Sequence, residues 1–434
     1  MTDGLANPMS TASPSVIEQG RMNGASDVSS SEPPPETGPE QPRIVRRSSS
    51  HRTAYVAAAV VIIVIVVVVA SFAAGWFKTS SESAPAGTCP TQQTLLGDGA
   101  NFVLPLVSTW TNAYGSVTSN NVNYNAAGAG AGITALTDKT VDFAATDEPL
   151  NSSQFSGLPS TTLTLPIAAG ALAIVYNLPT VATPVQLSGT VLAGIYLGTI
   201  NNWDDSAIAD INPSIQLPNA AITTVHRSDA AGTTFVLTDY LSEDNATWKA
   251  MVGVGIQPSW PAITPTPEAI KGNSALAAYV QKTPDTIGYV DLTDGLNTPG
   301  LQYANVLNPA GHYIRPTLAD AASAITNMTA RTTFPAPTAS WANVSMVNSP
   351  GTSDYPLATF SYFMVFQAVN AGYAPSLQKA QALVQWLNWT ITIGQTYSKN
   401  LYYVAVPSSL VALDESALKT MTFDGTAIPA CTTG

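Results

Sequence analysis

Charged residues are scarce in this sequence, and positive ones are the scarcest. Only 10% of the 434 residues are charged, and 16 Lys and Arg stand against 28 Asp and Glu, which gives a formal net charge of -12. Binding to a nucleic-acid backbone needs a basic surface, so a nucleic-acid partner is not expected. The hydrophobic share of 45% is nevertheless enough for a sizeable core and more than one domain.

Histidine is also rare, since the chain has only three: His51, His226 and His312. The H-E-x-x-H, G-x-S-x-G and P-loop patterns are absent. A hydrolase that acts on phosphate esters needs metal ligands or an activated nucleophile. The sequence therefore supports no catalytic site, no metal and no other cofactor, and a phosphatase is the weakest of the alternatives kept below.

Cysteine is nearly absent as well. Cys89 and Cys431 are the only two, and they lie near the two ends of the segment that follows residue 78. An oxidising compartment would permit a disulfide between them. They are a disulfide candidate, with two unpaired thiols as the alternative.

The sequence does contain one long uncharged stretch, TAYVAAAVVIIVIVVVVASFAAGWF, at residues 53–77. A helix needs about 20 apolar residues to cross a bilayer, and the arginines in RIVRRSSSHR just before it favour a cytoplasmic N-terminus. We expect a single-pass cell-membrane protein with a disordered cytoplasmic tail (1–52), an anchor (53–77), a stalk (78–92) and an extracellular remainder. A signal peptide cleaved near ASFAA is the alternative, although the run exceeds the usual apolar length of about 7 to 15 residues.

Beyond the stalk, strand-like and helix-like patterns alternate. NFVLPLVSTWTNAYG places Phe102, Leu106 and Trp110 four residues apart, which predicts a helix. VNYN, VDFAA and AGALAIVYN are typical of strands. Such alternation predicts an α/β fold with helices on the faces of a sheet.

Three junctions carry small residues just ahead of a helical pattern: GDGANF before residue 102, GAGAG before residue 133, and DAAGTTF before the pattern TFVLTDYLS. The first N–H groups of a helix are unpaired and its N-terminus is partly positive, so small residues let an anion reach the backbone. Taken singly, each run also fits an ordinary loop. Together with Arg227 and Asp147, they predict an anion site without net positive charge.

Five blocks follow one another between residues 93 and 412: GDGANFVLPLVSTW, VNYNAAGAGAGITALTDKTVDFAATDEPL, LAGIYLGTINNWDD, RSDAAGTTF and IGYVDLTDG. In order and spacing they resemble the phosphate-binding protein of the high-affinity phosphate ABC importer, a PstS-like family. The resemblance implies a two-lobed type II periplasmic-binding-protein-like fold with two hinge crossings. Residues 93–175 and 356–434 would form the first lobe and 176–355 the second. It also implies a monomer that holds inorganic phosphate between the lobes and delivers it to the permease subunits of the importer.

The anion contacts of that family can be carried over one position at a time. They fall on Asn101, the backbone N–H of Phe102, Ala129, Asp147, Arg227, Ala231, Gly232 and Thr233. Asp229 would hold the Arg227 guanidinium in a fixed fork and offset its charge, with a surface ion pair as the alternative. The family usually has hydroxyl residues at the positions of Ala129 and Ala231, and Thr or Ser at that of Asn101. Two side-chain donors are therefore missing, while the backbone N–H groups of both alanines are expected to remain.

Asp147 would set the choice of anion. An ionised carboxylate only accepts hydrogen bonds, so it favours an oxyanion that carries a proton, such as hydrogen phosphate, over sulfate. A cap for the following EPL turn is the alternative role. The expected function is membrane-anchored capture of phosphate for an ABC importer. The alternatives are an anchored sensor or adhesin with weak or altered oxyanion binding, arsenate included, and a phosphatase.

Overall fold

The computed structural model describes residues 87–429, 431 and 432. The expected tail (1–52), the expected anchor (53–77) and residues 78–86 of the expected stalk lie outside this range, so these assignments stay predictions. Within the described range, no helix is both long and apolar enough to cross a bilayer.

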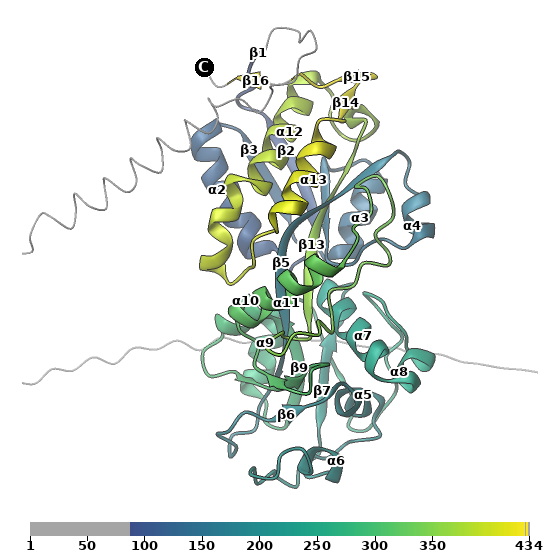
Figure 1. Ribbon diagram of the computed structural model, residues 1–434, viewed down its shortest axis with the longest axis vertical. Coiled ribbons are helices and arrows are strands. Elements are labelled where there is room, and N and C mark those ends of the chain that lie inside the picture. Colours follow the sequence, from purple (N-terminus) through teal and green to yellow (C-terminus); the bar gives the residue numbers. More distant parts are fainter. Residues whose placement is uncertain (1–86, 430, 433–434) are drawn as a thin grey trace, which may run out of the picture. The chain divides into compact units, whose positions relative to one another are not determined.

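One mixed sheet runs through the described residues, with strand order β3-β2-β4-β13-β5-β9-β7-β8 and β10 beside β5 (Figure 1). Its strands are β2 (Thr94–Gly99), β3 (Asn121–Asn125), β4 (Phe143–Thr146), β5 (Thr162–Tyr176), β7 (Thr223–Arg227), β8 (Glu268–Ile270), β9 (Thr286–Asp291), β10 (Gln302–Tyr303) and β13 (Ala358–Phe366). A small sheet joins β6 (Gln186–Leu187), β11 (Asn305–Leu307) and β12 (Tyr313–Ile314), and a hairpin joins β14 (Thr422–Phe423) to β15 (Thr426–Ala427).

β5 belongs to both halves of the main sheet. Residues 162–171 pair with β13, and residues 172–176 pair with β9. All of its residues are buried, which explains why the segment is apolar throughout and does not alternate with polar residues. The strand predicted at 169–177 is therefore present but begins earlier, at Thr162.

Helices pack on both halves of the sheet (Figure 1). The half with β2, β3 and β4 carries α2 (Leu104–Thr118), α3 (Ala129–Thr137), α4 (Ser152–Ser156), α12 (Leu377–Ile391), α13 (Ser408–Leu418) and the 3₁₀ segments η1 (Val369–Ala371) and η2 (Ile393–Leu401). The half with β7, β8 and β9 carries α5 (Gly189–Leu197), α6 (Ser206–Ala209), α7 (Gly232–Asp244), α8 (Ala246–Met251), α9 (Asn273–Lys282) and α10 (Leu292–Leu296). α11 (Leu318–Arg331) packs against β5 and β13.

Each half has its own large hydrophobic core. Val107, Trp110 and Trp386 belong to the core of the first half, and Trp203 and Tyr289 belong to that of the second. We call these halves the first and second lobes, and the predicted two-lobed α/β fold is confirmed. The chain passes between the cores within β5 and again near the start of β13. The lobe boundaries at 175/176 and 355/356 stay predictions.

Gly130 and Gly132 of the run at 128–132 lie within α3 and not ahead of it, and Gly128 is its N-cap. α3 begins at Ala129, so the helix start expected at residue 133 is wrong. A Cβ on Gly132 would lie 2.5 Å from the Cα of Gly99, so glycine here lets α3 pack closely against β2. The helix expected from Phe102 also begins slightly later, at Leu104, with Phe102 buried just ahead of it.

The two ends of the described chain lie together. β1 (Gly87–Thr88) pairs in parallel with β16 (Cys431–Thr432), and Cys89 and Cys431 form a disulfide. The bond joins residues separated by 342 positions. It therefore closes a loop that contains both lobes.

Candidate functional site

The predicted site residues lie at the ends of parallel strands from both lobes. In the first lobe, β2 pairs with β3 and β4 in parallel; Asn101 and Phe102 follow β2, Ala129 follows β3, and Asp147 follows β4. In the second lobe, Arg227 ends β7, and α7 starts at Gly232. Carboxyl ends of parallel strands meet at one edge of a sheet, where α/β proteins bind their ligands. The structure thus places these residues at or just beyond the ends of strands; their role in binding an anion stays a prediction.

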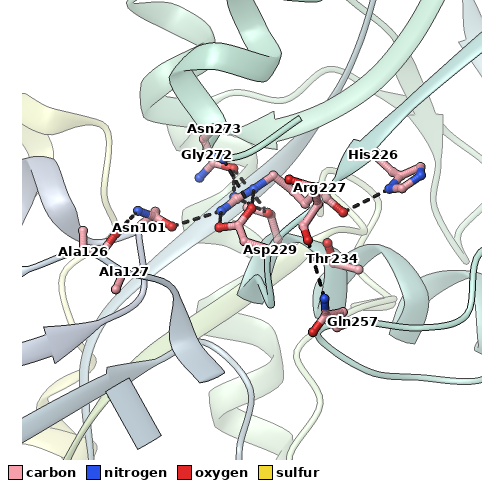
Figure 2. Close-up of polar contacts among 12 residues, drawn as sticks. Asn101, Ala126, Ala127, His226, Arg227, Asp229, Thr234, Gln257, Gly272 and Asn273 are labelled. Atoms are coloured by element: carbon pink, nitrogen blue, oxygen red, sulfur yellow. Dashed lines mark hydrogen bonds and ion pairs between the residues drawn. The ribbon is translucent and has the colours of Figure 1, made fainter. Parts of the chain in front are cut away.

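Arg227 is the centre of the polar cluster (Figure 2). Its side chain is 1% exposed, its Nε donates to Asp229 Oδ1 at 2.8 Å, and its Nη2 donates to Asp229 Oδ2. Nη2 also reaches Asn101 Oδ1 of the first lobe at 3.0 Å. A two-point Arg–carboxylate contact fixes the plane of the guanidinium, so this is a buried, oriented pair and not a surface ion pair.

Asp229 remains a carboxylate in this environment. Burial alone would raise its pKa, but the hydrogen bonds and positive charge of Arg227, together with the Gly272 backbone N–H, lower the pKa below its usual value. The Gly272 N–H donates to Asp229 Oδ1 at 3.3 Å. The charge of Arg227 is therefore offset by its neighbour, as the sequence predicted.

Asp147 is buried, with 1% of its surface exposed. Ser361 donates to its Oδ1, whereas its Oδ2 has no hydrogen-bond partner among the described residues. Burial raises the pKa of Asp147 to about 7, although the Ser361 hydrogen bond and the charge of Arg227 act in the opposite direction. A buried carboxylate oxygen without a donor is costly, so this oxygen suits a ligand that brings its own proton.

The N-terminus of α7 faces Asp147 from the other lobe. A Cβ on Gly232 would lie 2.0 Å from Asp147 Oδ2, so the carboxylate lies directly against the first turn of α7. Thr233 is buried, and its Oγ1 accepts a hydrogen bond from Arg227 Nη1 at 3.2 Å. The structure therefore brings Asp147, Arg227, Gly232 and Thr233 together.

One predicted donor is already used. The backbone N–H of Ala231 donates to the Ile256 carbonyl at 3.0 Å, so the expectation that this group remains for a ligand is not met. The reason is local, because Ala231 precedes α7 in an extended conformation that turns its N–H toward the segment after α8. Ala231 supplies neither a hydroxyl nor an unused backbone donor.

The remaining first-lobe residues frame the cluster. Asn101 Nδ2 donates to the Ala126 carbonyl, which turns its Oδ1 toward Arg227 (Figure 2). Phe102 is buried, with its carbonyl accepting from the Tyr403 hydroxyl at 2.5 Å. Ala129, also buried, begins α3, whose neighbouring Gly128 and Gly130 lie against Ala230 of the second lobe.

Sequence reasoning missed three polar residues of this cluster. Ser361 comes from β13, where it is opposite Asp147 because Tyr362 pairs with Thr146. Asn273 accepts from Arg227 Nη1, and Asn273 Nδ2 donates to Asp291 Oδ2 at 2.6 Å. The segment KGNSAL, with Asn273 at the start of a helix, is a fourth small-residue junction that could have pointed to this position.

A metal centre is not built into the described part of the chain. No group of three or more His, Cys, Asp or Glu within residues 87–429, 431 and 432 is arranged to hold an ion. The polar cluster instead combines an offset guanidinium, a helix N-terminus and a buried acceptor carboxylate. That combination suits a protonated oxyanion.

Comparison with known proteins agrees with this fold. The family model described as a PBP superfamily domain matches residues 84–392. The phosphate-binding protein PstS of Xylella fastidiosa (strain 9a5c) is 32% identical over 340 residues, covering 76% of this chain and 86% of that protein. The PstS protein of Pasteurella multocida is 34% identical over 329 residues, covering 76% and 90%.

Solved structures agree as well. The phosphate-binding protein from Stenotrophomonas maltophilia matches with a TM-score of 0.56 and 19% identity, covering 78% of this chain and 100% of that chain. A high-affinity periplasmic phosphate-binding protein bound with phosphate matches with a TM-score of 0.59 and 20% identity, covering 78% and 96%. At these sequence identities, the matches to solved structures show a similar fold and nothing further.

Proposed function

This chain belongs to the family of phosphate-binding PstS proteins within the PBP superfamily, and on that premise we propose that it is a solute-binding protein that captures inorganic phosphate between its two lobes. One observation carries the proposal: the buried, unpaired Oδ2 of Asp147 lies against the N-terminus of α7, beside the oriented Arg227. The first N–H groups of α7 would bind the charged oxygens of the anion. The guanidinium would bind them as well, with the anion replacing the contact from Nη2 to Asn101 Oδ1. Asp147 would accept its proton.

The same arrangement would reject sulfate. Sulfate has no proton at neutral pH and would leave Asp147 Oδ2 unsatisfied and close to a negative charge. Polar sites reject close analogues by large factors when a buried group loses its partner. Arsenate carries a proton as phosphate does, so this carboxylate alone would not exclude it.

Calorimetric titration of the purified full chain with phosphate, sulfate and arsenate tests the proposal. At about pH 8, where Asp147 is ionised, we expect heat of binding with phosphate, none with sulfate at the same concentrations, and weaker or comparable binding of arsenate. Absence of phosphate binding would favour the second candidate, an anchored sensor or adhesin that kept the fold. Two observations support that candidate: Ala129 and Ala231 lack hydroxyls, and the Ala231 N–H is engaged by Ile256.

We further propose that the chain is anchored in the cell membrane by residues 53–77 and passes phosphate to the permease subunits of an ABC importer. The uncharged length of 53–77 and the arginines before it support the anchor. The sequence blocks that resemble the phosphate-binding protein of the phosphate ABC importer support the importer. Protease added to intact cells should digest the two lobes and spare residues 1–52. Protection of the lobes would overturn the topology.

A further inference from the structure

Asn273 starts α9 at a strand–helix junction of the second lobe. β7 is paired in parallel with β8 on one side and β9 on the other. Asn273 follows β8, Arg227 ends β7 and Asp291 ends β9, so all three reach the same edge of the sheet. Asn273 is 2% exposed and Asp291 is fully buried.

The Asn273 amide joins the other two side chains. Arg227 Nη1 donates to its Oδ1, and its Nδ2 donates to Asp291 Oδ2 at 2.6 Å (Figure 2 shows Asn273 beside Arg227). A guanidinium has no acceptor, so the amide cannot be turned around without losing both bonds. Asp291 is held in turn, because its Oδ1 accepts the Asp294 backbone N–H at 2.8 Å.

The neutral amide of Asn273 lies between Arg227 and Asp291 and links the two side chains. Asp229 contacts Nε and Nη2 of Arg227 directly, whereas Asp291 reaches Nη1 only through Asn273. The guanidinium is thus held at both ends, with one carboxylate in direct contact and the second kept one side chain away. A second carboxylate in direct contact would add negative charge next to a bound anion.

We propose that Asn273 is a positioning residue of the anion site: it fixes Nη1 of Arg227 and links it to Asp291 without placing another charge beside the ligand. The identity of the anion as phosphate rests on the proposed function; the positioning of Arg227 does not.

The first test compares phosphate dissociation constants of Asn273→Ala, Asn273→Asp and wild type at about pH 5 and about pH 8, each as a ratio to wild type at the same pH. Asn273→Ala should bind about 10- to 100-fold more weakly at both pH values, since it loses a hydrogen bond to a charged group. Asn273→Asp should be weak at pH 8 and recover toward wild type at pH 5. The titratable groups facing it are Arg227 and Asp291, and burial raises the pKa of Asp291 well above its usual value. A protonated carboxyl at position 273 can accept from Arg227 and donate to Asp291.

Asn202→Asp is the matched control. Asn202 Oδ1 accepts the backbone N–H groups of Asp204 and Ala220, which a carboxylate can also do, and the change adds the same charge in the same lobe. Its phosphate affinity should equal that of wild type at both pH values. The proposal is overturned if Asn273→Asp loses the same factor at both pH values, or if both Asn273 variants bind as wild type does.

A second readout does not depend on the ligand. In nitrogen-15 NMR spectra, the Nη protons of Arg227 should give separate, slowly exchanging signals in wild type and in Asn202→Asp. In Asn273→Ala, the signal of the Nη1 proton that Asn273 accepts should be lost, while the other Nη1 proton still has Thr233 Oγ1 as acceptor. An unchanged Arg227 signal in Asn273→Ala overturns the positioning role. If wild type fails to bind phosphate, the proposed function fails, and this measurement still decides the role of Asn273.

Discussion

Asp147 of the first lobe lies against Gly232 of the second so closely that no side chain fits at position 232. A Cβ there would lie 2.0 Å from Asp147 Oδ2 and 2.3 Å from Asp147 Cβ. Gly232 is the first residue of α7, so an acceptor carboxylate from one lobe meets the N-terminus of a helix from the other. The Asp147 carboxylate is an acceptor and the first N–H groups of α7 are donors, so groups of both kinds meet between the two lobes.

Gly232→Ala should therefore disrupt the contact between Asp147 and the N-terminus of α7. We expect phosphate affinity to fall by about tenfold or more, because the methyl group separates Asp147 from α7. Stability should fall as well, because the Asp147 side chain or α7 must shift to make room for a Cβ that would lie 2.0 Å from Asp147 Oδ2. Titration with phosphate and thermal melting measure the two effects.

Gly255→Ala is the control for this substitution, since a Cβ on Gly255 would meet no atom within 4 Å. Equal phosphate affinities for Gly232→Ala, Gly255→Ala and wild type would show that the Asp147–Gly232 contact is not part of the binding site.

Arg227→Ala should weaken all oxyanions by a similar amount. The guanidinium supplies charge and donors to any of them, and its loss also leaves Asp229 buried without its partner, so we expect a loss of about 2 to 5 kcal/mol in binding free energy. Competition titrations with phosphate and arsenate measure it. Arg331→Ala, at an exposed position in the last turn of α11, is the control and should bind as wild type does. A loss confined to one anion would contradict the assigned role.

Cys89 and Cys431 should resist alkylation in the native protein until a reductant is added. The disulfide between them closes a loop of both lobes, and removing such a bond costs about 2 to 4 kcal/mol of unfolding free energy. Cys89→Ser, Cys431→Ser and the double variant should therefore unfold at similarly lower denaturant concentrations. Labelling of both thiols in native, unreduced protein would refute the bond.

Local patterns in the sequence predicted the strands and helices that flank the site. The segment RSDAAGTTF contains Arg227, Asp229 and the start of α7. Because Arg227 and Asp229 are two residues apart, their hydrogen bond is a local contact that the sequence could predict. The sequence predicts the glycines at 128–132 to precede the helix, because small residues ahead of a helix and small residues inside its first turn form the same local pattern. The close packing of Gly132 on Gly99 is a tertiary contact and leaves no local pattern.

Long-range partners were beyond such reasoning. Ser361 is 214 positions from Asp147 in the sequence, and the register of β13 on β4 places the two residues opposite each other. The pairing of β13 with β5 also has an irregularity between Ser361 and Tyr362. In the sequence, Ser361 is one polar residue within an apolar strand. Asn273 follows a strand of only three residues, β8, which is too short to show a period. The hydrogen bond from the Ala231 N–H to the Ile256 carbonyl is likewise a contact between separate segments, and no local sequence pattern predicts it.

Asp147→Asn should narrow the discrimination between phosphate and sulfate. The amide removes the negative charge and adds a donor, so sulfate binding should improve while phosphate loses its best acceptor. We expect the ratio of the two dissociation constants to shrink by about 10- to 100-fold at pH 8, equal to roughly 1.4 to 2.8 kcal/mol. An unchanged ratio would mean that Asp147 does not face the ligand.

The pH dependence of stability and of sulfate affinity in Asp147→Asn and wild type tests whether the Asp147 carboxylate is the group that titrates. Burial raises the pKa of Asp147 from 3.8 to about 7, so the folded protein keeps this proton at pH values where the unfolded chain has lost it. Wild type should therefore lose stability as pH rises from about 4 to about 7. Asp147→Asn should lose less over this range, because the other carboxyl groups with a raised pKa, such as Glu148, remain, and it should melt at a higher temperature at pH 8 than wild type. Below about pH 6, the protonated Asp147 can donate, so sulfate should bind wild type better there than at pH 8. In Asp147→Asn, the sulfate affinity should change little over this range, and a parallel pH dependence in both proteins would assign the effect to another group.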